Sequence, residues 1–219
     1  MISFAHVKAA ALTGLICLGL LASKAQAAQR ETLTVAGGCF WCVEADFESV
    51  RGVTEAISGY TGGATVNPTY RQVTGGNTGH YEAVQIQFDP SVVSRETLLS
   101  LFFMSIDPTD AGGQFCDRGE SYRTAVFVDG SAQQGVAEKV KAEAQAALGQ
   151  QIVTPILPQQ TFYPAEDYHQ DYYKSSDRLA FTSVGLGVKK SVAYKRYRKN
   201  CGRDARVRQL WGSAAPFAR

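Results

Sequence analysis

The stretch "ETLTVAGGCFWCVEADFESV" constrains the fold most, because it changes from strand to helix within a few residues. Glu31 to Ala36 is a short β-prone run with some apolar alternation. Gly37 and Gly38 then break it, and from Cys39 to Val50 the apolar residues recur with helical spacing. The sequence therefore predicts a strand, a tight turn and a helix, with Cys39 in the first helical turn.

A cysteine at the start of a helix is more typical of a reactive residue than of a structural one. Unpaired backbone N–H groups and the helix dipole favour a thiolate there. We therefore expect the pKa of Cys39 to lie below that of a free thiol. A structural cysteine more typically lies in the middle of an apolar face.

Residues 1–27 differ from the rest of the chain. Lys8 precedes an uncharged run of fourteen residues, "AAALTGLICLGLLA", and "AQA" at 25–27 has the small-x-small pattern that signal peptidase cleaves. The run is short for a transmembrane helix, and a buried N-terminal helix is the alternative. We expect a cleaved signal peptide over residues 1–27, a periplasmic or secreted protein, and no stable membrane anchor.

The remaining 192 residues (219 minus 27) suffice for one domain with its own core. Removing Lys8 and Lys24 takes the formal charge from +2 to 0, which leaves no global argument for binding nucleic acid. No repeat or low-complexity linker divides the chain. We expect a catalytic α/β domain over residues 28–188 and a basic tail over 189–219.

Alternation and breaker residues predict the other elements. Strands are expected over 53–63, 80–90, 122–129 and 152–158, and helices over 94–106 and 131–148. Strands connected by crossover helices predict an α/β (α+β) fold, a single domain in which helices pack on a mixed sheet.

Four cysteines follow residue 27: Cys39, Cys42, Cys116 and Cys201. In an exported protein an even number first suggests structural disulfides, although a domain of this size does not need them. A CxxC at a strand-to-helix turn is also typical of disulfide-exchange oxidoreductases. Two bulky aromatic residues between the cysteines would hinder the sulfur of a partner, so this alternative is weaker.

A metal-stabilised binding module is a third interpretation of the cysteines. A zinc site of the ribbon type needs a second CxxC or a closely spaced pair of histidines. Cys116, Cys201, His80 and His169 are all isolated in the sequence, which disfavours zinc.

Six motifs stand in order along the chain: "GGCFWCVEADF", "SGYTGG", "NPTY", "TGHYEAV", "DPTDAGGQFCDRGESYRTAVF" and "YPAEDYHQDYY". From about Leu33 to Trp211, this set resembles the A type of the peptide methionine sulfoxide reductases. The resemblance implies stereospecific reduction of methionine-S-sulfoxide, free or in oxidised proteins and peptides, to methionine. It also implies a plait-like core with long irregular loops, a cysteine nucleophile, and neither metal nor flavin.

Sulfoxide reduction needs a nucleophile, an acid near the oxygen and an apolar socket for the S-methyl group. Cys39 is the expected nucleophile, and Phe40 and Trp41 are expected to wall the methyl pocket unless they are ordinary core residues. Glu82 is the expected acid, because it shares a strand face with apolar residues and burial raises the pKa of a carboxyl group. The resemblance places the acid at the same position; a satisfied ion pair is the alternative.

The resemblance adds further residues that composition alone would not single out. It implies that Tyr70 and Tyr122 donate to the same oxygen and that Asp117 organises the adjoining loop. His80 and His169 match recurrent family positions, and we expect structural hydrogen bonds for both.

Oxygen transfer would leave Cys39 as a sulfenic acid that another thiol must resolve. Cys42, which stands where the commonest form of the family has glycine, is close in sequence. Cys201, in "RKNCGRD" of a flexible-looking tail, is similar to the C-terminal recycling cysteine of many members. The two could act in series, and their order stays open; Cys116 has no assignable role.

The segment from Lys189 to Arg208 carries nine Lys or Arg and one acid, Asp204. A solvated surface is the default interpretation, and docking of an electron donor or an acidic substrate surface is the alternative. The expected partners are oxidised proteins or peptides and a thioredoxin-like donor of the periplasm, which would supply the electrons in place of a cofactor. We expect a monomer that binds no nucleic acid.

Overall fold

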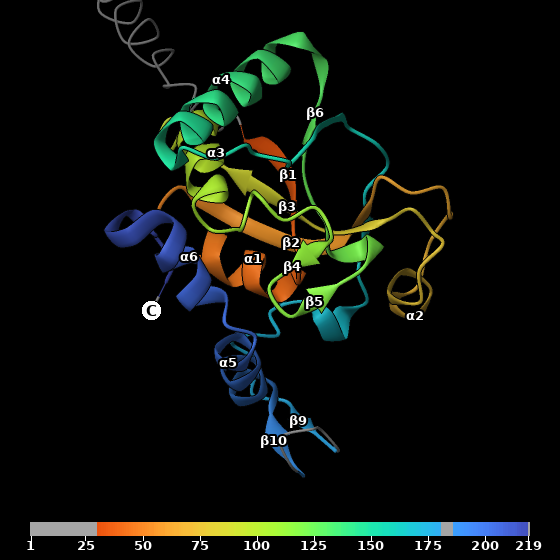
Figure 1. The fold of residues 1–219 in the computed structure, drawn as a ribbon. Helices are drawn as coiled ribbons and strands as arrows, with labels where there is room; N and C mark the ends of the chain where they lie inside the picture. Colours follow the sequence, from red (N-terminus) through yellow and green to blue (C-terminus); the bar gives the residue numbers. More distant parts are fainter. Residues whose placement is uncertain (1–29, 181–185, 219) are drawn as a thin grey trace, which may run out of the picture.

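The computed structural model describes residues 30–180 and 186–218, so the predicted signal peptide lies outside the described residues. A six-stranded sheet with the order β7-β6-β1-β3-β2-β8 forms the centre (Figure 1). Its strands are β1 (Glu31–Gly37), β2 (Val53–Thr61), β3 (Tyr81–Phe88), β6 (Thr124–Val128), β7 (Ile156–Pro158) and β8 (Tyr163–Pro164). Two short pairs lie outside it: β4 (Gly113–Gln114) with β5 (Asp117–Arg118), and β9 (Arg178–Leu179) with β10 (Val188–Lys189).

The sheet is mixed, as predicted. β1 runs antiparallel to both β3 and β6, so that Val35 lies opposite Val84 and Val126. β2 is antiparallel to β3 and β8, whereas β7 is parallel to β6. β1 therefore ends in the middle of the sheet, and the turn that follows it is surrounded by protein.

The helices are α1 (Phe40–Phe47), α2 (Tyr70–Thr74), α3 (Arg95–Phe103), α4 (Gly130–Leu148), α5 (Lys190–Asn200) and α6 (Arg203–Trp211). The predicted starts and stops are confirmed at two of them. The hydroxyl of Ser94 accepts a hydrogen bond from the N–H of Thr97 at 3.1 Å and caps α3. Gly149 ends α4 in the left-handed conformation.

The main core lies between one face of the sheet and α1, α3 and α4. It includes Leu33, Val35, Val84, Ile86, Phe40, Phe47, Leu98, Phe102 and Val140. Burial of each of these large side chains contributes about 1.5–3 kcal/mol to folding. A smaller cluster that includes Tyr81 and Phe127 covers the opposite face.

The expectation that the segment around Cys201 is flexible is wrong. This segment folds into α5 and α6, and Arg198 and Arg203 are only 9% and 2% exposed. Beyond them, Phe217 packs on Phe47 of α1 with ring centroids 5.8 Å apart. The basic composition misled the prediction, because these two arginines point inward to buried partners rather than to water.

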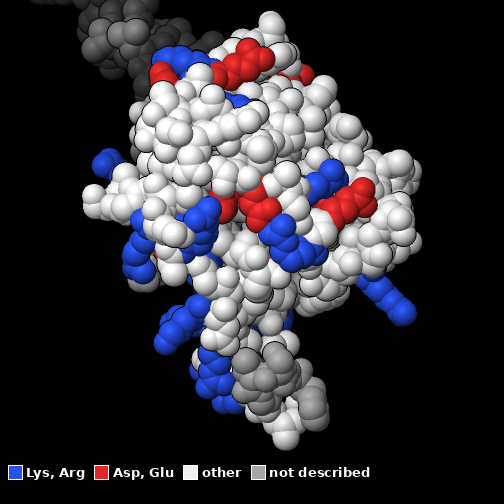
Figure 2. Space-filling model, viewed as in Figure 1, with Lys and Arg blue, Asp and Glu red and all other residues white. Residues whose placement is uncertain are grey.

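Lys and Arg side chains nevertheless spread over the surface where Figure 1 places α5 and α6 (Figure 2). Within residues 30–180 and 186–218, no helix combines the length and the apolar character that a membrane span requires.

Candidate active site

The turn between β1 and α1 places Cys39 at the N-cap of the helix. Gly38 has φ +77°, and a Cβ there would lie 2.5 Å from the Cβ of Gln114. A Cβ on Gly37 would lie 2.9 Å from the Val43 side chain. The two glycines therefore allow the strand to turn directly into the helix, in a space that a larger residue would fill.

The carboxyl group of Glu82 lies against the start of α1. It is 1% exposed, and its Oε2 accepts a hydrogen bond from the N–H of Phe40 at 3.1 Å. Burial raises the pKa of Glu82 to about 8, with a further upward contribution from the charge of Asp117, although the hydrogen bond from Phe40 opposes the shift. At neutral pH this carboxyl group is therefore mostly protonated.

A small cavity of about 60 Å³ opens at this point. It is lined by Cys39, Phe40, Trp41, Tyr70, Glu82, Asp117, Tyr122 and Tyr197. This volume holds a group of only a few atoms. The structure thus brings together seven residues that the sequence analysis named.

Tyr197 is the residue that sequence reasoning missed. It comes from α5, and its hydroxyl donates a hydrogen bond to Asp117. Nothing in "KRYRKN" distinguishes this tyrosine from the nine others in the chain (ten tyrosines in total). Only the packing of α5 beside the cavity identifies it.

Aromatic rings support the cavity from behind. Phe40 stacks on Tyr70 at a centroid distance of 6.3 Å, and Trp41 stacks on Tyr172 at 3.8 Å. His169 packs against both Phe40 and Tyr70, with its ring centroid 5.1 Å from that of Phe40 and 4.3 Å from that of Tyr70. The side chains of Phe40 and Trp41 are therefore packed on other rings where they line the cavity.

The two histidines behave differently. His80 makes the expected structural hydrogen bonds: its Nδ1 accepts from the N–H of Gly63 at 3.2 Å, and its other nitrogen lies 2.8 Å from the carbonyl oxygen of Thr65. The same expectation for His169 is wrong, because neither ring nitrogen has a hydrogen-bond partner within the described residues. Burial lowers the pKa of His169 to about 4, so its ring is neutral.

Cys39 and Cys42 are free thiols, 6% and 2% exposed, in one buried cluster. Burial raises the pKa of Cys39 well above its usual range, and the hydrogen bond to Cys42 raises it further. The expected lowering is therefore wrong. The N–H of Phe40, at the start of a helix of only eight residues, is already bonded to Glu82 and does not serve the thiol.

Cys42 shows the opposite shift. The hydrogen bond from Cys39 lowers the pKa of Cys42, against the effect of burial, and the positive charges of Arg203 and Arg198 lower it further. The two arginines therefore favour a thiolate at Cys42.

Cys201 is bonded to Cys116 in a disulfide with a Cα–Cα distance of 4.9 Å. The sequence analysis named Cys201 as a resolving or recycling thiol, with its order relative to Cys42 left open, and assigned Cys116 no role. Asp117 connects the disulfide to the cavity that it lines: its Oδ1 lies 3.9 Å from the sulfur of Cys116, and its Oδ2 lies 3.7 Å from that of Cys201. Cys116 is exposed, so the disulfide faces solvent on one side and Asp117 on the other.

The site combines a buried pair of thiols, a protonated carboxyl group and a second cysteine pair at the surface. This combination is typical of a thiol-based oxidoreductase. The model of the family described as peptide methionine sulfoxide reductase matches residues 31–208. The chain belongs to this family.

Individual relatives agree with this assignment. The chain is 48% identical over 199 residues to peptide methionine sulfoxide reductase MsrA 2 of Caulobacter vibrioides, covering 90% of this chain and 94% of the relative. It is 45% identical over 206 residues to the protein of the same name from Rhizobium meliloti, covering 93% and 95%.

Solved structures show the same fold. The reduced form of Mxr1 from Saccharomyces cerevisiae is 32% identical with a TM-score of 0.63, over 65% of this chain and 83% of that one. Methionine sulfoxide reductase A of Corynebacterium diphtheriae is 31% identical with a TM-score of 0.61, over 75% and 84%. The predicted α/β fold, enzyme class and family are confirmed.

Proposed function

We propose that this enzyme reduces methionine-S-sulfoxide, free or in oxidised proteins and peptides, to methionine. The observation that carries the proposal is the cavity in which a buried thiol, a protonated carboxyl group and two phenol hydroxyl groups face a space for a small group. Phe40 and Trp41 supply the apolar wall that an S-methyl group needs. No metal or organic cofactor takes part; the electrons come from thiols.

In the first step the sulfur of Cys39 attacks the sulfur of the sulfoxide. Glu82 gives its proton to the sulfoxide oxygen, and Tyr70 and Tyr122 hold that oxygen by hydrogen bonds. The high pKa values of the two tyrosines, which burial raises first and the charge of Glu82 next, keep both hydroxyl groups protonated as donors. The bond between the two sulfur atoms and the S–O bond of the substrate then break as the hydroxyl group passes to Cys39, and the thiol proton of Cys39 replaces the proton that Glu82 gave. Methionine leaves, and Cys39 becomes a sulfenic acid. The substrate gains the two electrons that Cys39 loses.

In the second step Cys42 attacks the sulfur of the Cys39 sulfenic acid. A Cys39–Cys42 disulfide forms, and the oxygen leaves as water with the proton of the sulfenic acid and a second proton from the site. Proximity supports Cys42 as the resolving thiol, because the two cysteines lie in the same buried cluster. Cys201 is instead engaged with Cys116.

In the third step Cys116 and Cys201, when both are reduced, pass their electrons to the Cys39–Cys42 disulfide and become a disulfide themselves. Asp117, which contacts both sulfur atoms of this pair and also lines the cavity, supports such an exchange. The exposed Cys116 is then the sulfur that a thioredoxin-like donor attacks. This arrangement avoids the problem that Phe40 and Trp41 hinder access to Cys39.

The alternative function, disulfide exchange with other proteins through Cys39 and Cys42, is disfavoured by the burial of both sulfur atoms. Turnover of separate epimers of a blocked methionine sulfoxide with a small dithiol distinguishes the two functions. We expect turnover of the S epimer and none of the R epimer. Equal use of both epimers, or reduction of scrambled disulfides without sulfoxide reduction, contradicts the proposal.

The proposed electron transfer between the two cysteine pairs is tested by counting the methionines that the reduced enzyme releases in the absence of an electron donor. A sulfoxide takes two electrons, so the four thiols of a fully reduced enzyme should release two methionines. Cys201→Ser should release one, and its turnover with a thioredoxin-like protein should fall by about tenfold or more, which corresponds to about 1.4 kcal/mol in the barrier. A small dithiol should restore turnover because it can reach the inner disulfide.

Cys116→Ser is the matched control and should behave in the same way. In oxidised wild-type enzyme, mass spectrometry should find peptide 96–118 linked to peptide 200–203, and peptide 31–51 lighter by two hydrogen atoms. Two methionines released by either serine variant, or a free Cys201 thiol after treatment with excess sulfoxide, would show that this scheme is wrong.

We also propose that the protein is exported and that its donor is a thioredoxin-like protein outside the cytoplasm. The pattern of residues 1–27 supports export. N-terminal sequencing of the protein from its native cells checks this, since a mature chain should begin at Ala28. A chain that retains Met1 contradicts export by cleavage.

A further inference from the structure

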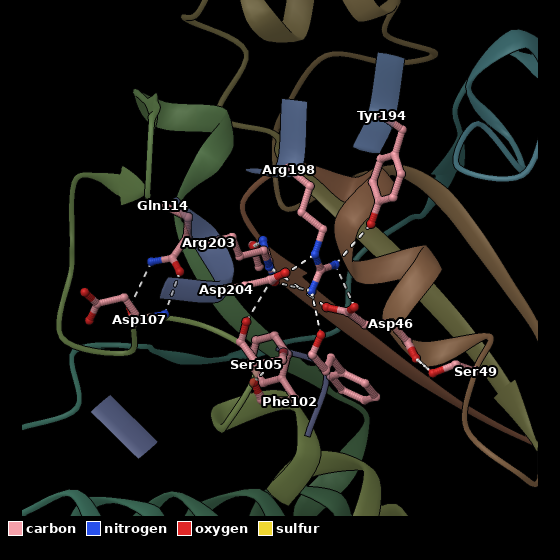
Figure 3. A network of polar contacts seen from close by, with 12 residues as sticks. Asp46, Ser49, Phe102, Ser105, Asp107, Gln114, Tyr194, Arg198, Arg203 and Asp204 are labelled. Carbon is pink, nitrogen blue, oxygen red and sulfur yellow. Dashed lines mark hydrogen bonds and ion pairs between the residues drawn. The ribbon is translucent and has the colours of Figure 1, made fainter. Parts of the chain in front are cut away.

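Two buried arginines from the C-terminal helices, Arg198 and Arg203, lie close to Asp46 of α1 (Figure 3). Arg198 of α5 donates to Asp46 of α1 at 2.7 Å and to Asp204 of α6 at 2.9 Å. It also donates to the hydroxyl of Tyr194 at 3.0 Å and to the carbonyl of Phe217 at 3.2 Å. Arg198 therefore holds α5, α6 and the end of the chain to α1.

Arg203 of α6 is buried more deeply than Arg198, and its positive charge is neutralised less by nearby carboxylates. It is 2% exposed, and it donates to the carbonyl oxygens of Gly37 at 3.1 Å and Ser105 at 3.2 Å. Its Nε lies 4.0 Å from Oδ2 of Asp46, and neither of these two atoms has a hydrogen-bond partner in the described parts of the chain. The carbonyls are neutral, so most of the charge of Arg203 is left to act on its surroundings.

Cys42 lies on the same helix as Asp46, the carboxylate that both arginines approach. Asp46 follows it by one helical turn on α1, so the two side chains share a face of the helix. Cys42 also packs in one cluster with Tyr194, the residue whose hydroxyl accepts from Arg198. Both guanidinium groups approach Asp46, which is more deeply buried than Asp204, the second carboxylate partner of Arg198, whose side chain is 21% exposed.

We propose that Arg203 and Arg198 are positioning residues that place buried positive charge behind Cys42, and thereby make Cys42 the thiolate that attacks the Cys39 sulfenic acid. The inference rests on the proposed function, in which Cys42 is the resolving thiol. It gives α5 and α6 a part in the second step that is separate from the contribution of Tyr197 to the cavity.

Some of the charged and titratable groups that face Cys42 favour its thiolate, and others disfavour it. They are Cys39 and Asp46 from the α1 region, Glu82 from β3, Tyr194, Tyr197 and Arg198 from α5, and Arg203 from α6. The arginines favour the thiolate of Cys42, whereas Asp46 disfavours it. Removing an arginine should therefore raise the pH at which Cys42 ionises, and removing the charge of Asp46 should lower it.

The test follows the resolving step alone over a range of pH. Reduced full-length enzyme is mixed with one equivalent of S-sulfoxide and quenched at short times. Mass spectrometry of peptide 31–51 then measures the trapped sulfenic acid against the Cys39–Cys42 disulfide, while methionine is measured in the same samples. The rate of disulfide formation should rise with pH to a plateau, and the midpoint reports the ionisation of Cys42.

Arg203→Met should move this midpoint upward by about one pH unit. Well below the midpoint the thiolate fraction falls about tenfold, but a more basic thiolate is about threefold more nucleophilic, so the rate should fall about threefold. Asp46→Asn should move the midpoint in the opposite direction, and Arg203→Lys, which keeps the charge, should stay close to the wild type. A purely structural role cannot produce opposite shifts.

Arg206→Met is the matched control, because Arg206 lies on the same helix but pairs with Asp107 and has 37% of its side chain exposed. Its midpoint should equal that of the wild type. Unchanged midpoints in Arg203→Met and Asp46→Asn, or shifts in the same direction, overturn the proposal. If Arg203→Met does not fold, the proposal is tested by Asp46→Asn alone. A midpoint lower than that of the wild type supports the proposal, and any other result overturns it. Failure of the wild type to release methionine would instead overturn the proposed function.

Discussion

Cys39→Ser is expected to abolish reduction of the S epimer, leaving only the rate of the enzyme-free control. An alcohol cannot take up the oxygen and be regenerated by thiols, and no other free thiol of the described chain lines the cavity. Methionine release in a single turnover measures the effect directly. Circular dichroism should show that the fold is kept, since the change replaces one sulfur by one oxygen.

Cys42→Ser is the matched control for this loss, because it makes the same atomic change three residues along the chain. It should release its first methionine at nearly the wild-type rate and then accumulate the Cys39 sulfenic acid. Substantial turnover by Cys39→Ser would remove Cys39 from the role of nucleophile.

Glu82→Gln should slow the sulfoxide-reduction step by on the order of 10² to 10⁴, or about 2.7–5.4 kcal/mol in the barrier. The amide keeps the shape and can still accept from Phe40, but it cannot give a proton to the sulfoxide oxygen. Because the pKa of Glu82 is raised to about 8, the acid form is lost as the pH rises through that value. Wild-type methionine release should therefore decline above about pH 8.

The glutamine variant should lack that decline, since it has no proton to lose. Single-turnover methionine release from pH 6 to pH 10 checks both the size of the effect and its pH dependence. A decrease smaller than about threefold at neutral pH, with the decline unchanged, would assign Glu82 to the structure of the β1–α1 turn rather than to proton transfer.

The sequence predicted the central part of this site because local patterns determine it. Alternation places Glu82 on the face of β3 that also carries Val84 and Ile86, and all three are buried. The two glycines specify the turn that places Cys39 at the start of α1. Both features follow from residues that are close together in the sequence.

The other parts of the site depend on contacts between distant segments. Cys116 and Cys201 are 85 residues apart, and no local pattern indicates that they meet. The pKa of Cys39 was predicted in the wrong direction because the folded chain buries this thiol, and burial raises its pKa. In addition, the N–H of Phe40 at the helix start is bonded to Glu82, 43 residues after Cys39 in the chain (82 minus 39). Arg203 looked like a surface residue of a basic tail until its buried carbonyl and carboxylate partners were located.

The position of α5 and α6 at the end of the chain has a consequence for biosynthesis. Chains are synthesised from the N-terminus, so Cys39 and Cys42 leave the ribosome long before Tyr194, which packs against them, and Arg203, whose charge acts on Cys42. During that interval the two thiols lack Tyr194 and the charges of both arginines. A chain that ends after residue 189 would contain every strand of the six-stranded sheet, but it would lack α5 and α6, which complete the surroundings of the thiols.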